Sequence, residues 1–247
     1  MSDLVMQLAG VIQHDMDTLG EVAQNVANAN TPGYKAARSF NTLSAAAMAS
    51  AADAGQAGAA SAFSRGLGSI ERQGALRQDT GALQQTGRAL DFAISGDAWF
   101  VVQTEQGEQL TRDGRFRVDV DGRLVTQAGH AVQGQGGVIT PGQGELTVDA
   151  TGLLRVNGDE VAQFRLVRAS DVSALQVVGG GRYQSARPLL PAQNYAVHQG
   201  RLERSNAELG ADMVKIMEAS RHVESMQRAL SAYDSMLNSG INQLGKD

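Results

Sequence analysis

The feature that constrains the fold most is a pair of regularly spaced apolar seams, one at each end of the 247-residue chain. Near the N-terminus, apolar residues recur in steps of three and four, which places them on one side of a helix. The residues of this first seam are Val5, Leu8, Ile12, Leu19, Val22 and Val26, with Asp15 as its polar member. We expect a helix over residues 2–30, because Pro32 restricts the residue before it and Gly33 readily adopts positive φ.

The C-terminal region repeats the pattern and predicts a second helix over residues 206–238. Its seam contains Leu209, Met213, Ile216, Ser220, Val223, Gln227, Leu230, Asp234 and Leu237. The sequence Ser205-Asn206-Ala207-Glu208 is typical of a capping box, in which two side chains satisfy each other's backbone donors at a helix start. Gly240 is the expected end of this helix.

Neither helix can bury its apolar stripe alone, so the two ends of the chain are expected to pair and enclose the middle as an inserted domain. The predicted fold class is α+β, with paired N- and C-terminal heptad helices, coiled-coil-like, and a mainly antiparallel β domain between them. The polar seam positions allow two interpretations. They are half exposed, or they bond to neighbouring subunits and specify register in a larger helical array.

The middle of the chain alternates apolar and polar residues with a period of two, which predicts half-buried strands. Asp121-Gly122 and Asn157-Gly158 favour two-residue hairpin turns, because both central positions need positive φ. The residues expected in the core of this β domain are Ile94, Trp99, Phe100, Val102, Phe116, Val118, Leu124, Phe164 and Leu166.

These patterns divide the chain into four segments. Residues 1–35 form the N-terminal helix of a terminal-helix domain, and residues 36–79 form a linker or extended arm rich in Ala, Gly and Ser. Residues 80–190 form the β domain. Residues 191–247 contain a connection and the C-terminal helix, which completes the terminal-helix domain.

Composition excludes several classes of function. A net charge of -5 argues against nucleic-acid partners, and no apolar stretch is long enough for direct membrane insertion. The first residues lack a basic region followed by an apolar run, so we expect export without a cleaved signal peptide if the protein works outside the cytoplasm. The chain has no cysteine, its four histidines are far apart, and no nucleophile motif occurs. We predict no enzyme activity, no catalytic residues, no metal site and no cofactor.

Three blocks of sequence resemble one known family. Residues 25–35, Asn-Val-Ala-Asn-Ala-Asn-Thr-Pro-Gly-Tyr-Lys, resemble the N-terminal signature of the flagellar rod and hook proteins, although Gln24 stands where many members have Asn. Residues 199–206, Gln-Gly-Arg-Leu-Glu-Arg-Ser-Asn, are similar to the C-terminal signature, with Ala207 in place of the usual Val. Residues 86–94, 99–102, 110–116 and 121–126 resemble the β-domain blocks. The resemblance covers nearly the whole chain except the Ala-rich arm.

This resemblance implies a structural axial subunit of the bacterial flagellar basal-body rod, located in the periplasm, that assembles through its terminal helices and transmits torque. The implied partners are proximal and distal rod subunits, copies of itself and the flagellar type III export apparatus. The proximal-rod members are the most similar, and the distal-rod members are the alternative. Asn25, Asn28, Asn30, Ser205 and Asn206 join the two seams as candidate interface residues.

Two other classes of function remain open from the residues alone. One is an envelope-binding β module whose helices only dimerise it, and the other is an unrecognised hydrolase. Neither explains why both ends of the chain carry a seam.

Overall fold

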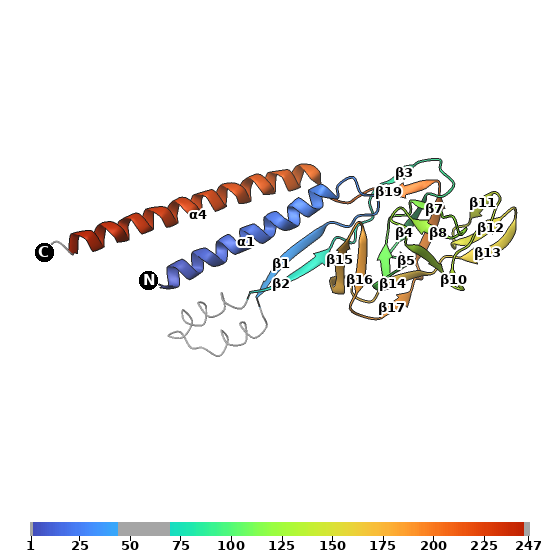
Figure 1. Ribbon diagram of the computed structural model, residues 1–247, viewed down its shortest axis with the longest axis horizontal. Coiled ribbons are helices and arrows are strands. Elements are labelled where there is room, and N and C mark those ends of the chain that lie inside the picture. Colours follow the sequence, from blue (N-terminus) through green and yellow to red (C-terminus); the bar gives the residue numbers. More distant parts are fainter. Residues whose placement is uncertain (1, 44–69, 245–247) are drawn as a thin grey trace. The chain divides into compact units, whose positions relative to one another are not determined.

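The computed structural model describes residues 2–43 and 70–244, which form two long helices and many short strands (Figure 1). The predicted α+β fold class is confirmed, and every strand pairing in the described part is antiparallel. The chain forms two compact units. We call residues 1–27 with 207–247 the helix unit, and residues 28–206 the β unit.

The helix unit consists of α1 (Ser2–Ala27) and α4 (Leu209–Leu244). The two helices pack against each other and run in opposite directions (Figure 1). In the described part of the chain, neither helix is long and apolar enough to span a membrane.

The helix ends differ from the prediction. α1 ends three residues before Asn30, because the Asn-rich segment forms a turn in which the Thr31 amide donates to the Asn28 carbonyl over 2.9 Å. α4 begins at Leu209 rather than Asn206, whose side chain is bonded within the β unit. It also continues through Gly240, since a glycine inside a helix costs only about 1 kcal/mol.

The main sheet of the β unit has ten strands. Seven follow one another in the order β15 (Leu175–Gly179), β16 (Arg182–Ser185), β6 (Gly107–Thr111), β5 (Trp99–Thr104), β9 (Ala131–Gly134), β8 (Leu124–Thr126) and β7 (Phe116–Val118). The other three branch from this path and are β10 (Gly137–Val138) beside β9, β14 (Leu166–Ala169) beside β5, and β17 (Leu189–Pro191) beside β14. A 3₁₀ helix, η2 (Val172–Ala174), precedes β15.

Four smaller sheets complete the β unit. They are β11 (Leu146–Val148) with β12 (Leu153–Val156) and β13 (Asp159–Gln163), β18 (Tyr195–Gln199) with β4 (Phe92–Gly96), β19 (Arg201–Glu203) with β3 (Leu83–Gln85), and β1 (Ala37–Leu43) with β2 (Ile70–Leu76). The last pair lies in the predicted linker, and β18 and β19 extend beyond the predicted boundary at 190. Residues 44–69 of the predicted arm are outside the described residues.

The β unit has two apolar cores. The first is centred on four aromatic rings, Phe92, Phe100, Phe116 and Phe164, and each ring centroid lies 5.1 to 6.2 Å from those of at least two others. The second packs around Trp99, Leu110 and Tyr183. Eight of the nine residues expected in the core are buried, whereas Val118 is 39% exposed because it ends the short strand β7 at the edge of the sheet.

The two expected hairpin turns have different outcomes. Asn157 and Gly158 have φ of 52° and 96° and form the two-residue turn between β12 and β13. Asp121-Gly122 lies instead in a five-residue connection, 119–123, between β7 and β8. The Asp119 carboxylate accepts from the amides of Asp121 and Arg123 and so stabilises the longer loop.

Candidate assembly interface

The described apolar residues of the predicted α1 seam are buried or half-buried. Val22 is buried, and Ile12, Leu19 and Val26 are half-buried. On α4, Ile216, Ser220, Val223 and Leu230 are half-buried, but Leu209, Met213 and Gln227 are exposed. The predicted role of these three residues at an interface between subunits stays a prediction. The side chains of Val5, Leu8, Asp234 and Leu237 are outside those that the structure describes.

Asp15 has a partner inside its own chain. Its carboxylate oxygen Oδ2 lies 2.6 Å from Nδ1 of His222 on α4, and Asp15 is only 8% exposed. A buried polar group is stabilised when it is hydrogen-bonded. This intramolecular pair was predicted by neither interpretation of the polar seam positions.

One side of α4 presents large apolar side chains to solvent. Leu209, Met213, Val214 and Met217 are 46% to 54% exposed, and at 100° per residue they share one side of the helix. We call these four residues the exposed stripe. Met16 of α1 is 56% exposed as well. Grouped apolar residues on a surface are typical of interaction sites.

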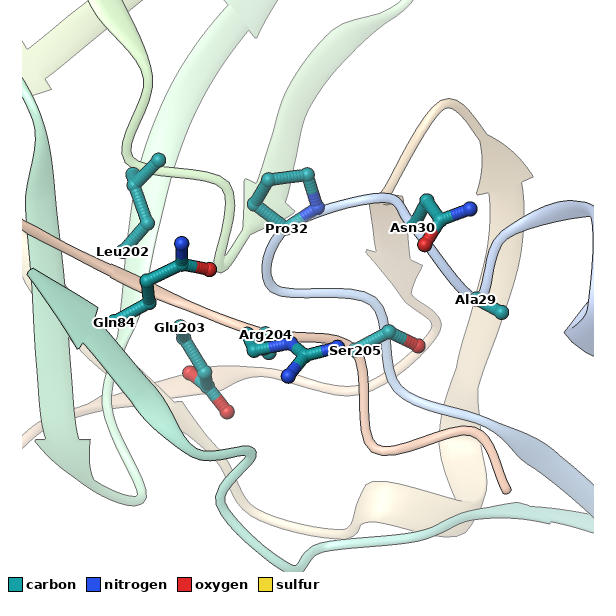
Figure 2. A pocket seen from close by; sticks show the side chains of 8 residues that line it. All are labelled: Ala29, Asn30, Pro32, Gln84, Leu202, Glu203, Arg204 and Ser205. Carbon is teal, nitrogen blue, oxygen red and sulfur yellow. The ribbon is translucent and has the colours of Figure 1, made fainter. Parts of the chain in front are cut away.

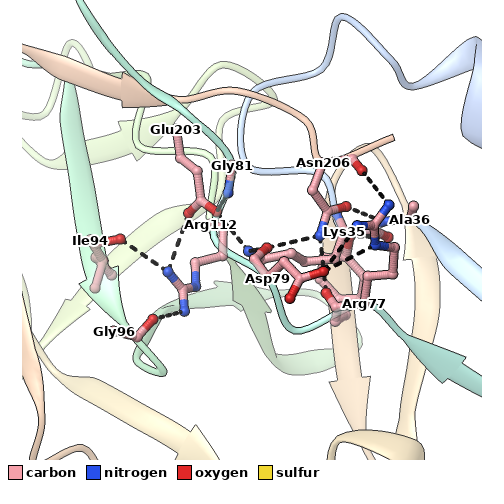
Figure 3. A network of polar contacts seen from close by, with 11 residues as sticks. Lys35, Ala36, Arg77, Asp79, Gly81, Ile94, Gly96, Arg112, Glu203 and Asn206 are labelled. Atoms are coloured by element: carbon pink, nitrogen blue, oxygen red, sulfur yellow. Dashed lines mark hydrogen bonds and ion pairs between the residues drawn. The ribbon is translucent and has the colours of Figure 1, made fainter. Parts of the chain in front are cut away.

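The two ends of the β unit meet at a network of backbone and amide hydrogen bonds. The Gly33 amide donates to the Glu203 carbonyl over 2.8 Å, and the Asn206 amide donates to the Tyr34 carbonyl over 3.2 Å. The Asn206 side chain accepts from the Ala36 amide at 2.7 Å and donates to the carbonyls of Arg77 and Asp79. Asn206 thus joins three segments of the chain (Figure 3).

Three charged side chains are buried beside this network. Nζ of Lys35 lies 2.6 Å from Oε1 of Glu203, and Nη1 of Arg112 lies 3.2 Å from Oε2 of the same carboxylate. All three side chains are at most 2% exposed. Nζ of Lys35 also donates to the Asp79 carbonyl, and Arg112 donates to the carbonyls of Ile94 and Gly96 (Figure 3).

The electrostatics of this cluster are unbalanced, because two cations share one carboxylate. Burial lowers the pKa of Lys35 and of Arg112, and the adjacent Glu203 opposes this effect in both cases. The Arg112 guanidinium also lies 5.2 Å from the centre of the Trp99 ring. Burial likewise raises the pKa of Tyr183, whose hydroxyl accepts from the Lys35 amide. Because Glu203 is held by both cations, its role is structural.

The backbone at Gly33 is pressed against the loop that carries Arg112. Gly33 has a φ of 68°, and a Cβ at this position would lie 2.2 Å from the Arg112 carbonyl carbon. Only glycine fits this conformation and this approach. Gly33 of the N-terminal signature therefore allows residues 31–33 to pack closely against the loop that carries Arg112, within the β unit.

A cavity of about 350 Å³ lies next to the network, between residues 29–32 and 202–205 (Figure 2). The predicted interface residues Asn30 and Ser205 both line it. Asn25 is buried in α1, and the half-buried Asn28 accepts from the Thr31 hydroxyl. Among the described residues, no group of three or more His, Asp or Glu is placed to hold a metal ion.

The cluster of Lys35, Arg112 and Glu203 was missed as a functional set by the sequence analysis. The signal was present, since each residue lies in one of the three recognised sequence blocks. Nothing in the sequence indicated that the three side chains contact one another.

Comparison with known proteins assigns the family. The model "Flagellar hook protein FlgE/F/G D1 domain" matches residues 93–157, and "Flagellar basal body rod FlgEFG protein C-terminal" matches residues 198–244. The rod protein FlgF of Caulobacter vibrioides is 33% identical over 234 residues, covering 91% of each chain. FlgF of Escherichia coli is 31% identical over 99% of this chain and 98% of its own, and FlgG of Bacillus subtilis is 30% identical over 93% of both.

The matches extend over the helix unit and the β unit alike. With relatives above 30% identity aligned along nearly their whole length, this chain belongs to the flagellar basal-body rod protein family and is FlgF-like.

Proposed function

We propose that this non-enzymatic structural subunit of the flagellar basal-body rod occupies the proximal rod and enters it through its helix unit. Family membership gives the basal body as its location and other rod and hook proteins as its class of partner. The proximal position is favoured by the FlgF relatives. A distal-rod role is the second candidate, because FlgG of Bacillus subtilis is similar over most of both chains.

The observation that carries this proposal is the exposed stripe on α4. Its four side chains are each about half exposed in the single chain. Covering the remaining apolar surface of such side chains contributes roughly 1 kcal/mol each. We infer that helices of neighbouring rod subunits pack on this stripe in a heptad, coiled-coil-like arrangement, so that the helix pair is completed by assembly.

The described side chains of the helix unit are mostly not buried, which supports the same proposal. Among the described side chains of α4 only Asp212 is buried, and on α1 only Asp15, Val22 and Asn25 are. Burial of so few side chains offsets little of the conformational entropy lost on ordering two long helices. We expect the isolated subunit to be less helical in circular dichroism than the assembled rod protein. Full helix content in the purified monomer would contradict this expectation.

Further parts of the proposal follow from the class of protein. The subunit contacts copies of itself as well as other rod proteins, reaches the periplasm through the flagellar export apparatus without a cleaved signal peptide, and transmits torque along the rod. The hydrolase is not favoured, because Glu203, the carboxylate at the described cavity, is already paired with Lys35 and Arg112. Neither the hydrolase nor the envelope-binding module explains why both ends of the chain carry a seam.

Replacing Met217 by glutamate tests the proposal, because it places a charge in the centre of the exposed stripe. We expect Met217→Glu to abolish swimming and rod incorporation when the variant gene replaces the strain's own copy. Ala229→Glu is the matched control, since it adds the same charge at an exposed α4 position away from the stripe. The control should swim normally, and normal swimming of Met217→Glu would refute the stripe as an interface.

A further inference from the structure

We propose that Lys35, Arg112 and Glu203 form a closure latch, through which the β unit reaches its packed state only when the segment 201–206 docks. Glu203 is separated from Lys35 by 168 residues and from Arg112 by 91. The carboxylate that both buried cations need therefore arrives with the last strand of the unit, β19. This inference concerns folding of the β unit and does not depend on the position of the protein in the rod.

The two buried cations need the carboxylate of Glu203 before this region can pack. With the segment 201–206 in place, each cation has a carboxylate oxygen within 3.2 Å and is excluded from water. Without it, Lys35 and Arg112 are two positive groups that must remain hydrated, because burying an unpaired charge is strongly unfavourable. The two cations thus oppose packing of this region until Glu203 is present.

The segment 201–206 also forms hydrogen bonds with backbone donors and acceptors in several parts of the β unit. Oε1 of Glu203 accepts from the Gly81 amide over 2.9 Å, and β19 pairs with β3. The Asn206 amide group bonds the residues at 36, 77 and 79. Docking of one short segment therefore completes the hydrogen bonding of residues 33–36 and 77–81 together.

The latch makes a distinctive prediction about variants. Replacing Glu203 leaves two buried cations, whereas replacing Lys35 leaves a matched pair of Arg112 and Glu203. An ordinary hydrogen bond between Lys35 and Glu203 would be lost equally in both cases. The latch requires that replacing Glu203 lower the stability more than replacing Lys35 does. It also requires that replacing Lys35 restore part of the stability lost in the Glu203 variant.

The experiment uses the full-length protein and the fluorescence of its single tryptophan, Trp99, during unfolding in urea. Glu203→Gln should lower the urea midpoint at least twice as much as Lys35→Met. The double variant Lys35→Met/Glu203→Gln should have a higher midpoint than Glu203→Gln alone. If Glu203→Gln does not fold, recovery of folding in the double variant supports the latch. Equal shifts in the two single variants, or a double variant no better than Glu203→Gln, would overturn it.

Hydrogen exchange tests the docking step separately. In Glu203→Gln, or in Glu203→Asp if the former does not fold, peptides covering residues 31–38, 77–84 and 200–206 should lose protection together. Peptides covering the central strand β5 should remain protected, because Val101 and Val102 are fully buried in the cores. Faster exchange confined to residues 200–206 would show that residues 31–38 and 77–84 stay packed when this segment is loosened, and would refute the latch.

Discussion

Replacing Gly33 by alanine is expected to weaken the β unit at the point where the chain enters it. Two costs act together at this residue. A φ of 68° costs an alanine about 1–2 kcal/mol, because its Cβ crowds the following carbonyl. A Cβ only 2.2 Å from the Arg112 carbonyl carbon must also push the two backbones apart by more than an ångström. Overpacking of this kind adds about 1–3 kcal/mol, so the total loss should be about 2–5 kcal/mol.

Gly87 provides a matched control for this prediction. Its φ of 71° is nearly the same as that of Gly33, but a Cβ there would meet nothing within 4 Å. Gly87→Ala therefore carries only the conformational cost of about 1–2 kcal/mol. The difference in the free energy of unfolding between the two variants isolates the cost of the close approach between residues 31–33 and the Arg112 loop.

Urea unfolding followed by Trp99 fluorescence measures both variants. Trp99 is 4% exposed and belongs to the second core of the β unit, so its emission reports on this unit. With a slope of about 2 kcal/mol per molar urea, the Gly33 variant should unfold at a midpoint about 0.5–1.5 M below the Gly87 variant. Midpoints that agree within experimental error would refute the tight seating of residues 31–33.

Three further changes have expected outcomes. Gly20→Ala should raise the helix content of the free subunit in circular dichroism, because Gly20 is exposed on α1 and alanine favours the helix by about 1 kcal/mol. Asn206→Ala should lower the free energy of unfolding by about 2–4 kcal/mol in urea titrations, since it removes the three hydrogen bonds that the side chain makes to backbone groups of Ala36, Arg77 and Asp79. Burial and the nearby Arg182 lower the pKa of His130, so the unfolded chain protonates first as the pH falls, and stability should drop between about pH 7 and pH 5. His130→Gln should flatten that pH profile.

The fold class could be predicted from the sequence because periodicity records burial. Alternation with a period of two predicted Phe116 and Phe164 as core residues, and both are fully or almost fully buried. Steps of three and four likewise predicted both helices. Val118 shows the limit of the method, since alternation gives the face of a strand but not whether the core extends to its end.

The contacts of Lys35, Arg112 and Glu203 could not be predicted, because periodicity carries no information about pairing between distant polar residues. Lys35 and Glu203 are normally surface residue types, and a single sequence favours exposed positions for both. Their burial depends on each other and on Arg112. The interpretation of Asn206 as a helix start was wrong for the same reason: its amide is bonded to backbone groups far away in the sequence.

The exposure of Leu209 and Met213 on α4 indicates how the helix unit is used. A seven-residue repeat drifts by about 20° per heptad around a straight α-helix, so one partner cannot cover the whole predicted seam of a 36-residue helix. In this chain the half-buried positions begin at Ile216 and continue through Val223 and Leu230, while the first residues of the repeat turn away from α1. At 100° per residue, Leu209, Met213 and Met217 follow one another at intervals of about 40° around the helix, and Val214 lies about 60° beyond Met217. A second helix is therefore needed to cover the start of α4, and we expect a neighbouring subunit to supply it.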